Sequence, residues 1–327
     1  MASLTWRNRA VTVSCVCGFL AITRTLIEDP WLRAERQYLF VITLGYGHLL
    51  GAAVFARQRM ADLIPARFSR RRAGGAIGLA VLDLFVVYAW ATHVTLAVFL
   101  PMLVVSIWHV VENDLFLRRA YAGPIGMGPV PRSSDHQVAA IAATALLASL
   151  GQQLLSPAAG AALLGGTRGA ELGHTLLRAA ALGGGLWITA KSRGGYRAFG
   201  AAVALATVTL SLVPTLLSNV SFGDFFSALT LYHLIQFLLL FADRIRRIPD
   251  RAARRAQVRR LAWVHVPAFV LCASLLLLPG DGLATLRYAV FSPAIYLFWS
   301  VLHVGQTLAV RGLERARVAS PSPLAAC

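Results

Sequence analysis

Long apolar runs separated by short, polar, arginine-rich segments dominate this 327-residue chain. Most runs approach the roughly 20 residues that an α-helix needs to cross the hydrocarbon core of a bilayer. The pattern predicts an all-α fold, a polytopic transmembrane helical bundle with about ten spans. The predicted spans are residues 10–27, 37–56, 76–93, 95–115, 138–154, 175–190, 198–218, 224–242, 261–278 and 286–310.

Composition supports a membrane protein, because 57% of the residues are hydrophobic and only 14% are charged. The net charge of +17 is concentrated in arginine clusters between the apolar runs. Such clusters are typical of cytoplasmic loops. We therefore expect membrane lipids as partners and no nucleic acid. The alternation places both termini in the cytoplasm, in a bacterial-type inner or plasma membrane.

The chain shows no repeat and no linker between soluble domains. We predict a single transmembrane domain over residues 1–310 and a disordered cytoplasmic tail over 311–327. The four cysteines lack metal or disulfide spacing, so neither a zinc site nor a disulfide is expected. Residues 24–36 break the charge rule, because they place arginines on the predicted outer side: Arg24, Arg33 and Arg36.

Four histidines lie at a similar distance from the arginine-rich ends of their spans. Because a helix rises about 1.5 Å per residue, equal spacing from the next arginine predicts one common depth. The spacings are eight to eleven residues, with His48 before Arg57, His109 before Arg118, His233 before Arg244 and His303 before Arg311. Imidazoles at one level predict a metal site, and iron suits such ligands. Structural histidines that bond across helices are the alternative.

Carboxylates and amides near this level are expected to support the ligands. Glu112 and Asp114 are the predicted catalytic carboxylates, which would orient the histidines by accepting their free ring N–H groups. Asp83, on an oppositely running span, reaches the same layer and is expected to act similarly. Gln236 and Gln306 each follow a histidine by three residues and share its helix face. His265, nearer the arginine-rich boundary, is expected to be structural or interfacial.

Three short motifs surround these histidines. Ser106, His109, Glu112 and Asp114 match a Ser-x-x-His-Phe-Gly-Glu-x-Asp stretch, and Gly45-Tyr-Gly-His48 is similar to Gly-x-Pro-His-Gly. Tyr232-His233-Leu-Ile-Gln-Phe237 falls where a His-x-x-x-His pair is expected. In these motifs the chain resembles the Brp/Blh-type membrane β-carotene dioxygenases, iron proteins that cleave a carotenoid at its central double bond to give retinal.

The chain departs from that family at several motif positions. Phe237 stands where the family has a ligating histidine, Leu49 replaces a glycine, and Val110-Val111 replaces Phe-Gly. The resemblance therefore requires His303, on another helix, to supply the fourth ligand.

These patterns lead to one preferred hypothesis and two alternatives. The preferred hypothesis is a membrane-embedded non-haem iron oxygenase, an oxidoreductase of dioxygenase type that uses Fe(II) and acts on a lipophilic, carotenoid-like small molecule. One alternative is a b-type cytochrome with haem b held by histidines on two helices. The other is a transporter with an intramembrane histidine relay. No oligomeric state is predicted.

Overall fold

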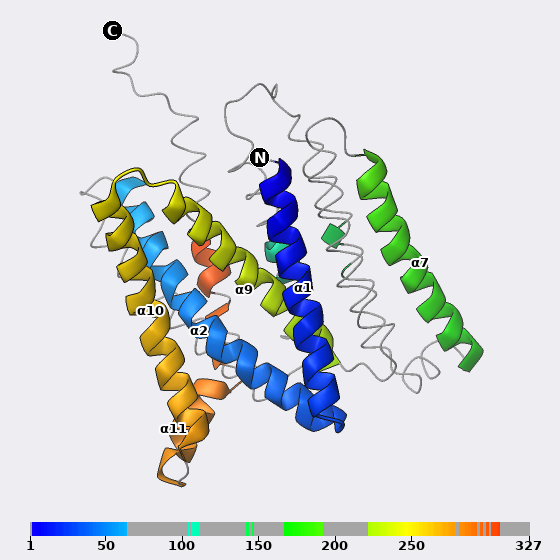
Figure 1. Ribbon diagram of the computed structural model, residues 1–327. Helices are drawn as coiled ribbons and strands as arrows, with labels where there is room; N and C mark the ends of the chain where they lie inside the picture. The colour runs from blue at the N-terminus through cyan, green and yellow to red at the C-terminus, as the bar shows by residue number, and fades with distance from the viewer. Residues whose placement is uncertain are drawn as a thin grey trace. The chain divides into compact units, whose positions relative to one another are not determined.

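The computed structural model describes residues 2–63, 104, 106–111, 142–143, 146, 167–191, 222–278, 281–292, 295–296, 299–300 and 302–307. The regular elements in these ranges are all helices, in agreement with the predicted all-α fold, and no strand occurs among them. The elements are α1 (Ala2–Leu26), α2 (Pro30–Leu63), α7 (Thr167–Lys191), α9 (Phe222–Arg246), α10 (Arg251–Leu277), the 3₁₀ helix η2 (Asp281–Leu283) and α11 (Ala284–Phe291) (Figure 1).

Three helical segments within the described ranges are long and apolar enough to cross a membrane: Pro30–Val54, Phe226–Asp243 and Arg251–Leu277. A shorter apolar segment, Ala10–Leu26, lies in α1. These segments are compatible with a membrane protein. The predicted spans 76–93 and 198–218 lie outside the described residues, and 95–115 and 138–154 mostly do, so the total of ten spans stays a prediction.

Helices α2 and α10 begin earlier than the apolar pattern predicts, because aspartates cap their first turns. The Asp29 carboxylate accepts the Trp31 and Leu32 N–H groups at 2.8 and 2.9 Å, which starts α2 at residue 30 instead of 37. Asp250 caps α10 in the same way, so that helix begins ten residues before the predicted 261. Both helices thus extend beyond their apolar cores.

The prediction of one continuous helix over 286–310 is wrong. Helix α11 ends at Phe291, and Ser292 is extended, with φ −60° and ψ 130°. Proline follows Ser292, and a residue before proline is driven out of the helical region by contact with the proline ring. Helical residues are described again at 295–296, 299–300 and 302–307.

The chain forms two compact units. Unit 1 consists of Met1–Val41 and Ile107–Arg247, and unit 2 consists of Ile42–Ser106 and Ile248–Cys327. In unit 1, α1 packs against α9, and the Phe19 ring stacks on Phe40 of α2 with 5.1 Å between centroids. Val16 and Leu20 of α1 are buried in this packing.

Unit 2 contains the second half of α2, helices α10 and α11, and the helical residues 295–296, 299–300 and 302–307. Helix α10 leads through η2 into α11 (Figure 1), and Arg287 of α11 donates to the carbonyl oxygens of Leu275 and Leu278. Glycines on α2 allow the neighbouring helices a close approach. A Cβ at Gly47 would lie 2.9 Å from the His265 ring.

Candidate metal centre

His48 and His303 form a pair inside unit 2. Their Nε2 atoms are 3.3 Å apart, and the rings meet edge to face, with centroids 4.8 Å apart and planes inclined by 73°. Both side chains are buried. Helix α2 supplies one imidazole and the helical segment 302–307 the other, so the pair joins residues 255 positions apart in the sequence.

A pair of tyrosines near the histidine pair, Tyr46 and Tyr296, provides a further contact with α2. The Tyr46 ring packs edge-on against Tyr296, with centroids 6.1 Å apart, and its hydroxyl donates to the Val290 carbonyl. Gly45 makes room for this packing, because a Cβ there would lie 2.7 Å from the Tyr296 hydroxyl. The absence of a side chain at Gly45 therefore allows Tyr296 to approach α2 closely.

The Nε2 separation matches two neighbouring ligands of one ion. With metal–imidazole bonds of about 2.0–2.1 Å, two nitrogens 3.3 Å apart subtend an angle of about 107° at the metal, close to the tetrahedral value. Two axial ligands of one haem would stand on opposite sides of the iron, about 4 Å apart. The same distance also suits a single hydrogen bond between a protonated and an unprotonated ring nitrogen.

His109 and His233 form a second pair, inside unit 1. Their ring centroids are 5.1 Å apart and their planes are inclined by 61°. His109 is buried and His233 is half-buried on α9. Each unit thus pairs two of the four histidines for which the sequence predicts a common depth.

Of the predicted supporting residues, the two glutamines lie within the described ranges. Gln236 on α9 is only 6% exposed, and neither its Nε2 nor its Oε1 has a hydrogen-bond partner among the described residues. Gln306 is half-buried in segment 302–307. Asp83, Glu112 and Asp114 lie outside the described residues, so their predicted roles stay predictions.

His265 on α10 packs against the same helix as His48. Its Nδ1 lies 3.0 Å from the Leu261 carbonyl oxygen and must donate to it, since a carbonyl only accepts. The ring lies over Gly47 and Gly51, where an added Cβ would come within 2.9 and 3.0 Å of ring atoms. This packing fits the structural role expected for His265.

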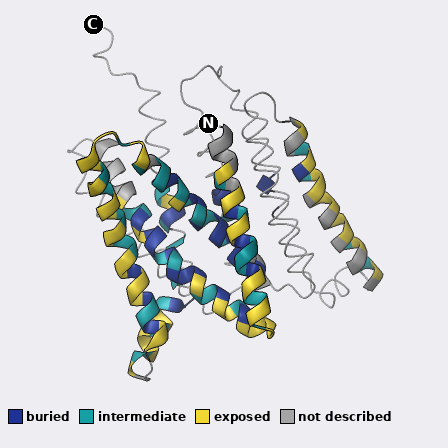
Figure 2. Cartoon of the chain, viewed as in Figure 1, coloured by how far each residue is buried: buried dark blue, intermediate teal, exposed yellow. Residues whose placement is uncertain are grey.

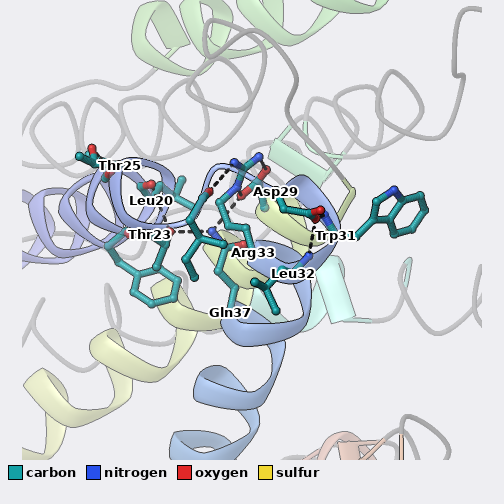
Figure 3. Close-up of polar contacts among 12 residues, drawn as sticks. Leu20, Thr23, Thr25, Asp29, Trp31, Leu32, Arg33 and Gln37 are labelled. Carbon is teal, nitrogen blue, oxygen red and sulfur yellow. Dashed lines mark hydrogen bonds and ion pairs between the residues drawn. The ribbon is translucent and has the colours of Figure 1, made fainter.

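A charged cluster in unit 1 was missed by the sequence interpretation. The Arg33 guanidinium contacts both oxygens of Asp224, with Nε–Oδ1 at 3.3 Å and Nη2–Oδ2 at 3.4 Å, and donates to the Ile27 carbonyl. Gln37 Nε2 donates to Asp224 Oδ1 and to the Thr23 hydroxyl, each at 2.8 Å. Figure 3 shows Arg33, Gln37 and Thr23 turned toward one another.

The cluster is buried and links three helices, so loss of either charged partner would leave an uncompensated charge. The Arg33 and Asp224 side chains are only 5% and 9% exposed, and the contacts join α1, α2 and α9. The cluster explains one arginine of the exceptional segment 24–36, because Arg33 is neutralised by an aspartate from another helix. The available signal was Asp224 itself, an acidic residue at the start of an apolar run.

Comparison of this chain with protein-family models, with curated proteins and with solved structures found no match.

Proposed function

We propose that this chain is a membrane-embedded iron enzyme whose ion is bound by His48 and His303, with His109 and His233 completing the ligand set. The single observation that carries the proposal is the buried His48–His303 pair, whose Nε2 atoms stand 3.3 Å apart. The other two ligands are proposed from their common helix depth. Imidazole ligands suit iron as well as zinc and copper.

The proposed reaction is oxygen-dependent cleavage of a lipophilic, carotenoid-like substrate, as the motifs around His48 and His109 suggest. An iron(II) ion held by histidines supplies the one-electron and dioxygen chemistry that protein side chains lack. The chain's own contribution is to hold the imidazoles in place from separate helices. Apolar helices around them favour a substrate dissolved in the bilayer.

The test is turnover by the purified full-length protein. The protein is loaded with Fe(II) in detergent and incubated with β-carotene in air, and aldehyde products are separated by chromatography. We expect aldehyde formation that stops under argon and falls at least about a hundredfold in His303→Gln, since loss of a ligand removes the ion. The matched control is His265→Gln, which should keep most of the activity.

Two results would contradict the proposal and identify its competitors. An intense visible absorbance from tightly bound haem would indicate a b-type cytochrome. Absence of any bound transition metal, together with absence of turnover, would favour a histidine relay in transport.

A further inference from the structure

Helix α10 presents a continuous exposed ridge along one face. Residues three or four positions apart on a helix lie on the same side. On α10, one set of residues with this spacing is exposed from the first turn of the helix to residue 270. In Figure 2, much of α10 is coloured yellow, which marks exposed residues. We define the α10 ridge as Arg251, Arg255, Arg259, Trp263, Val266 and Val270.

The ridge changes from cationic to apolar at a single point. Its first three members are arginines, Trp263 is 73% exposed, and Val266 and Val270 are 56% and 53% exposed. From residue 259 to residue 270 the helix rises about 16 Å, which is about half of a 30 Å hydrocarbon core. Tryptophan commonly lies at the boundary between headgroups and acyl chains. The ridge therefore has the polarity profile of one phospholipid leaflet.

The arginines on the ridge need negative charge from outside the helix. Like charges four residues apart repel one another and destabilise a helix. Helix α10 contains no Asp or Glu, and the described residues provide no ion pair to Arg251, Arg255 or Arg259. The adjacent Asp250 carboxylate is already bonded to the N–H groups that it caps.

We propose that the α10 ridge binds an anionic phospholipid of the adjoining leaflet. Arg255 and Arg259 hold the headgroup phosphate, since guanidinium groups bind phosphate through paired hydrogen bonds. An acyl chain lies along Val266 and Val270, and Trp263 marks the boundary between the two. This inference is independent of the proposed enzyme activity, because it uses no histidine.

The test compares variants that remove equal charge on and off the ridge. Full-length protein in detergent is incubated with equimolar phosphatidylglycerol and phosphatidylcholine, isolated by size exclusion, and its bound lipids are quantified. The ridge variant is Arg255→Gln/Arg259→Gln. The control is Arg246→Gln/Arg260→Gln, which removes two exposed arginines outside the ridge. Glutamine is a good helix former, so both variants should fold.

We expect the wild type to retain phosphatidylglycerol in preference to phosphatidylcholine. The ridge variant should lose about tenfold or more of this preference, and the control should stay within about twofold. Equal losses in both variants, or no preference in the wild type, would overturn the proposal. Nucleic acid that co-purifies with the wild type and is lost from the ridge variant, with lipid unchanged, would overturn it in favour of a nucleic-acid surface.

Discussion

The charged cluster of unit 1 and the histidine pair of unit 2 are both buried polar contacts between helices. They differ in whether their groups carry opposite charges. In the cluster, Arg33 meets a carboxylate of opposite charge, and Gln37 adds hydrogen bonds to it. In the pair, His48 and His303 are like groups that share at most one proton between facing nitrogens. The cluster is therefore self-sufficient as a structural link, whereas the pair suits a shared cation.

This difference predicts opposite responses to mutation. Changes in the cluster should lower the stability of the protein whether or not metal is present. Changes in the histidine pair should act mainly on metal content. The expected loss of stability decreases in the order Asp224→Ala, Gln37→Leu, Gly45→Ala and Asp250→Asn.

Asp224→Ala should be the most destabilising change. It leaves the buried Arg33 charge without its carboxylate, which costs about 3–5 kcal/mol in comparable pairs. The free energy of unfolding can be measured by SDS titration of the purified protein. Arg247→Gln is the matched control, since it breaks an i,i+4 pair to Asp243 in which the arginine is 47% exposed, and it should cost less than about 1 kcal/mol. Similar losses in the two variants would show that the cluster is not a special link.

Gln37→Leu should cost about 2–3 kcal/mol, because it removes hydrogen bonds to Asp224 and Thr23. Gln236→Leu is the informative comparison, since Gln236 is a buried glutamine with no hydrogen-bond partner among the described residues. Without added ligand it should not destabilise the protein. If Gln236→Leu costs as much as Gln37→Leu in the same titration, Gln236 has a structural role.

Gly45→Ala should cost about 1–3 kcal/mol, because the new methyl group would meet the Tyr296 side chain and force it away from α2. It should also lower metal content by separating His48 from His303. Gly18→Ala on α1 is the control, since nothing lies within 4 Å of its Cβ position, and alanine there should stabilise the helix slightly. Normal stability and metal content in Gly45→Ala would refute this account of the tyrosine packing.

Asp250→Asn should have the smallest effect, and one that depends on pH. The N–H groups of Ala253 and Ala252 hold the pKa of Asp250 below its ordinary value. A carboxyl group whose pKa is lowered by folding stabilises the folded protein at pH values above the ordinary pKa of the group. This stabilisation is lost as the pH falls through the lowered pKa. The difference in thermal midpoint between wild type and Asp250→Asn should therefore be present at neutral pH and vanish in acid. A difference independent of pH would contradict the capping role.

The sequence predicts the helices of this fold better than their contacts. Apolar runs locate α2, α9 and α10, and the positions of the arginines predict one common level for the four histidines. Neither pattern shows which histidines pair, because helix rotation and packing bring His48 to His303 from 255 residues away. The Arg33–Asp224 contact is equally non-local, spanning 191 positions. Helix caps and prolines are local sequence signals that the apolar pattern leaves out. Asp29 and Asp250 shift the starts of two helices, and the proline after Ser292 divides the predicted last span.

The most direct test of the central claim is the iron content of purified full-length protein after Fe(II) loading and removal of free metal. Wild type, His48→Gln, His303→Gln and His265→Gln are compared by elemental analysis. The account predicts about one iron per chain in wild type and His265→Gln, and at least a roughly tenfold loss in each of the other two. Full iron retention in both His48→Gln and His303→Gln, or no stoichiometric iron in the wild type, would contradict it.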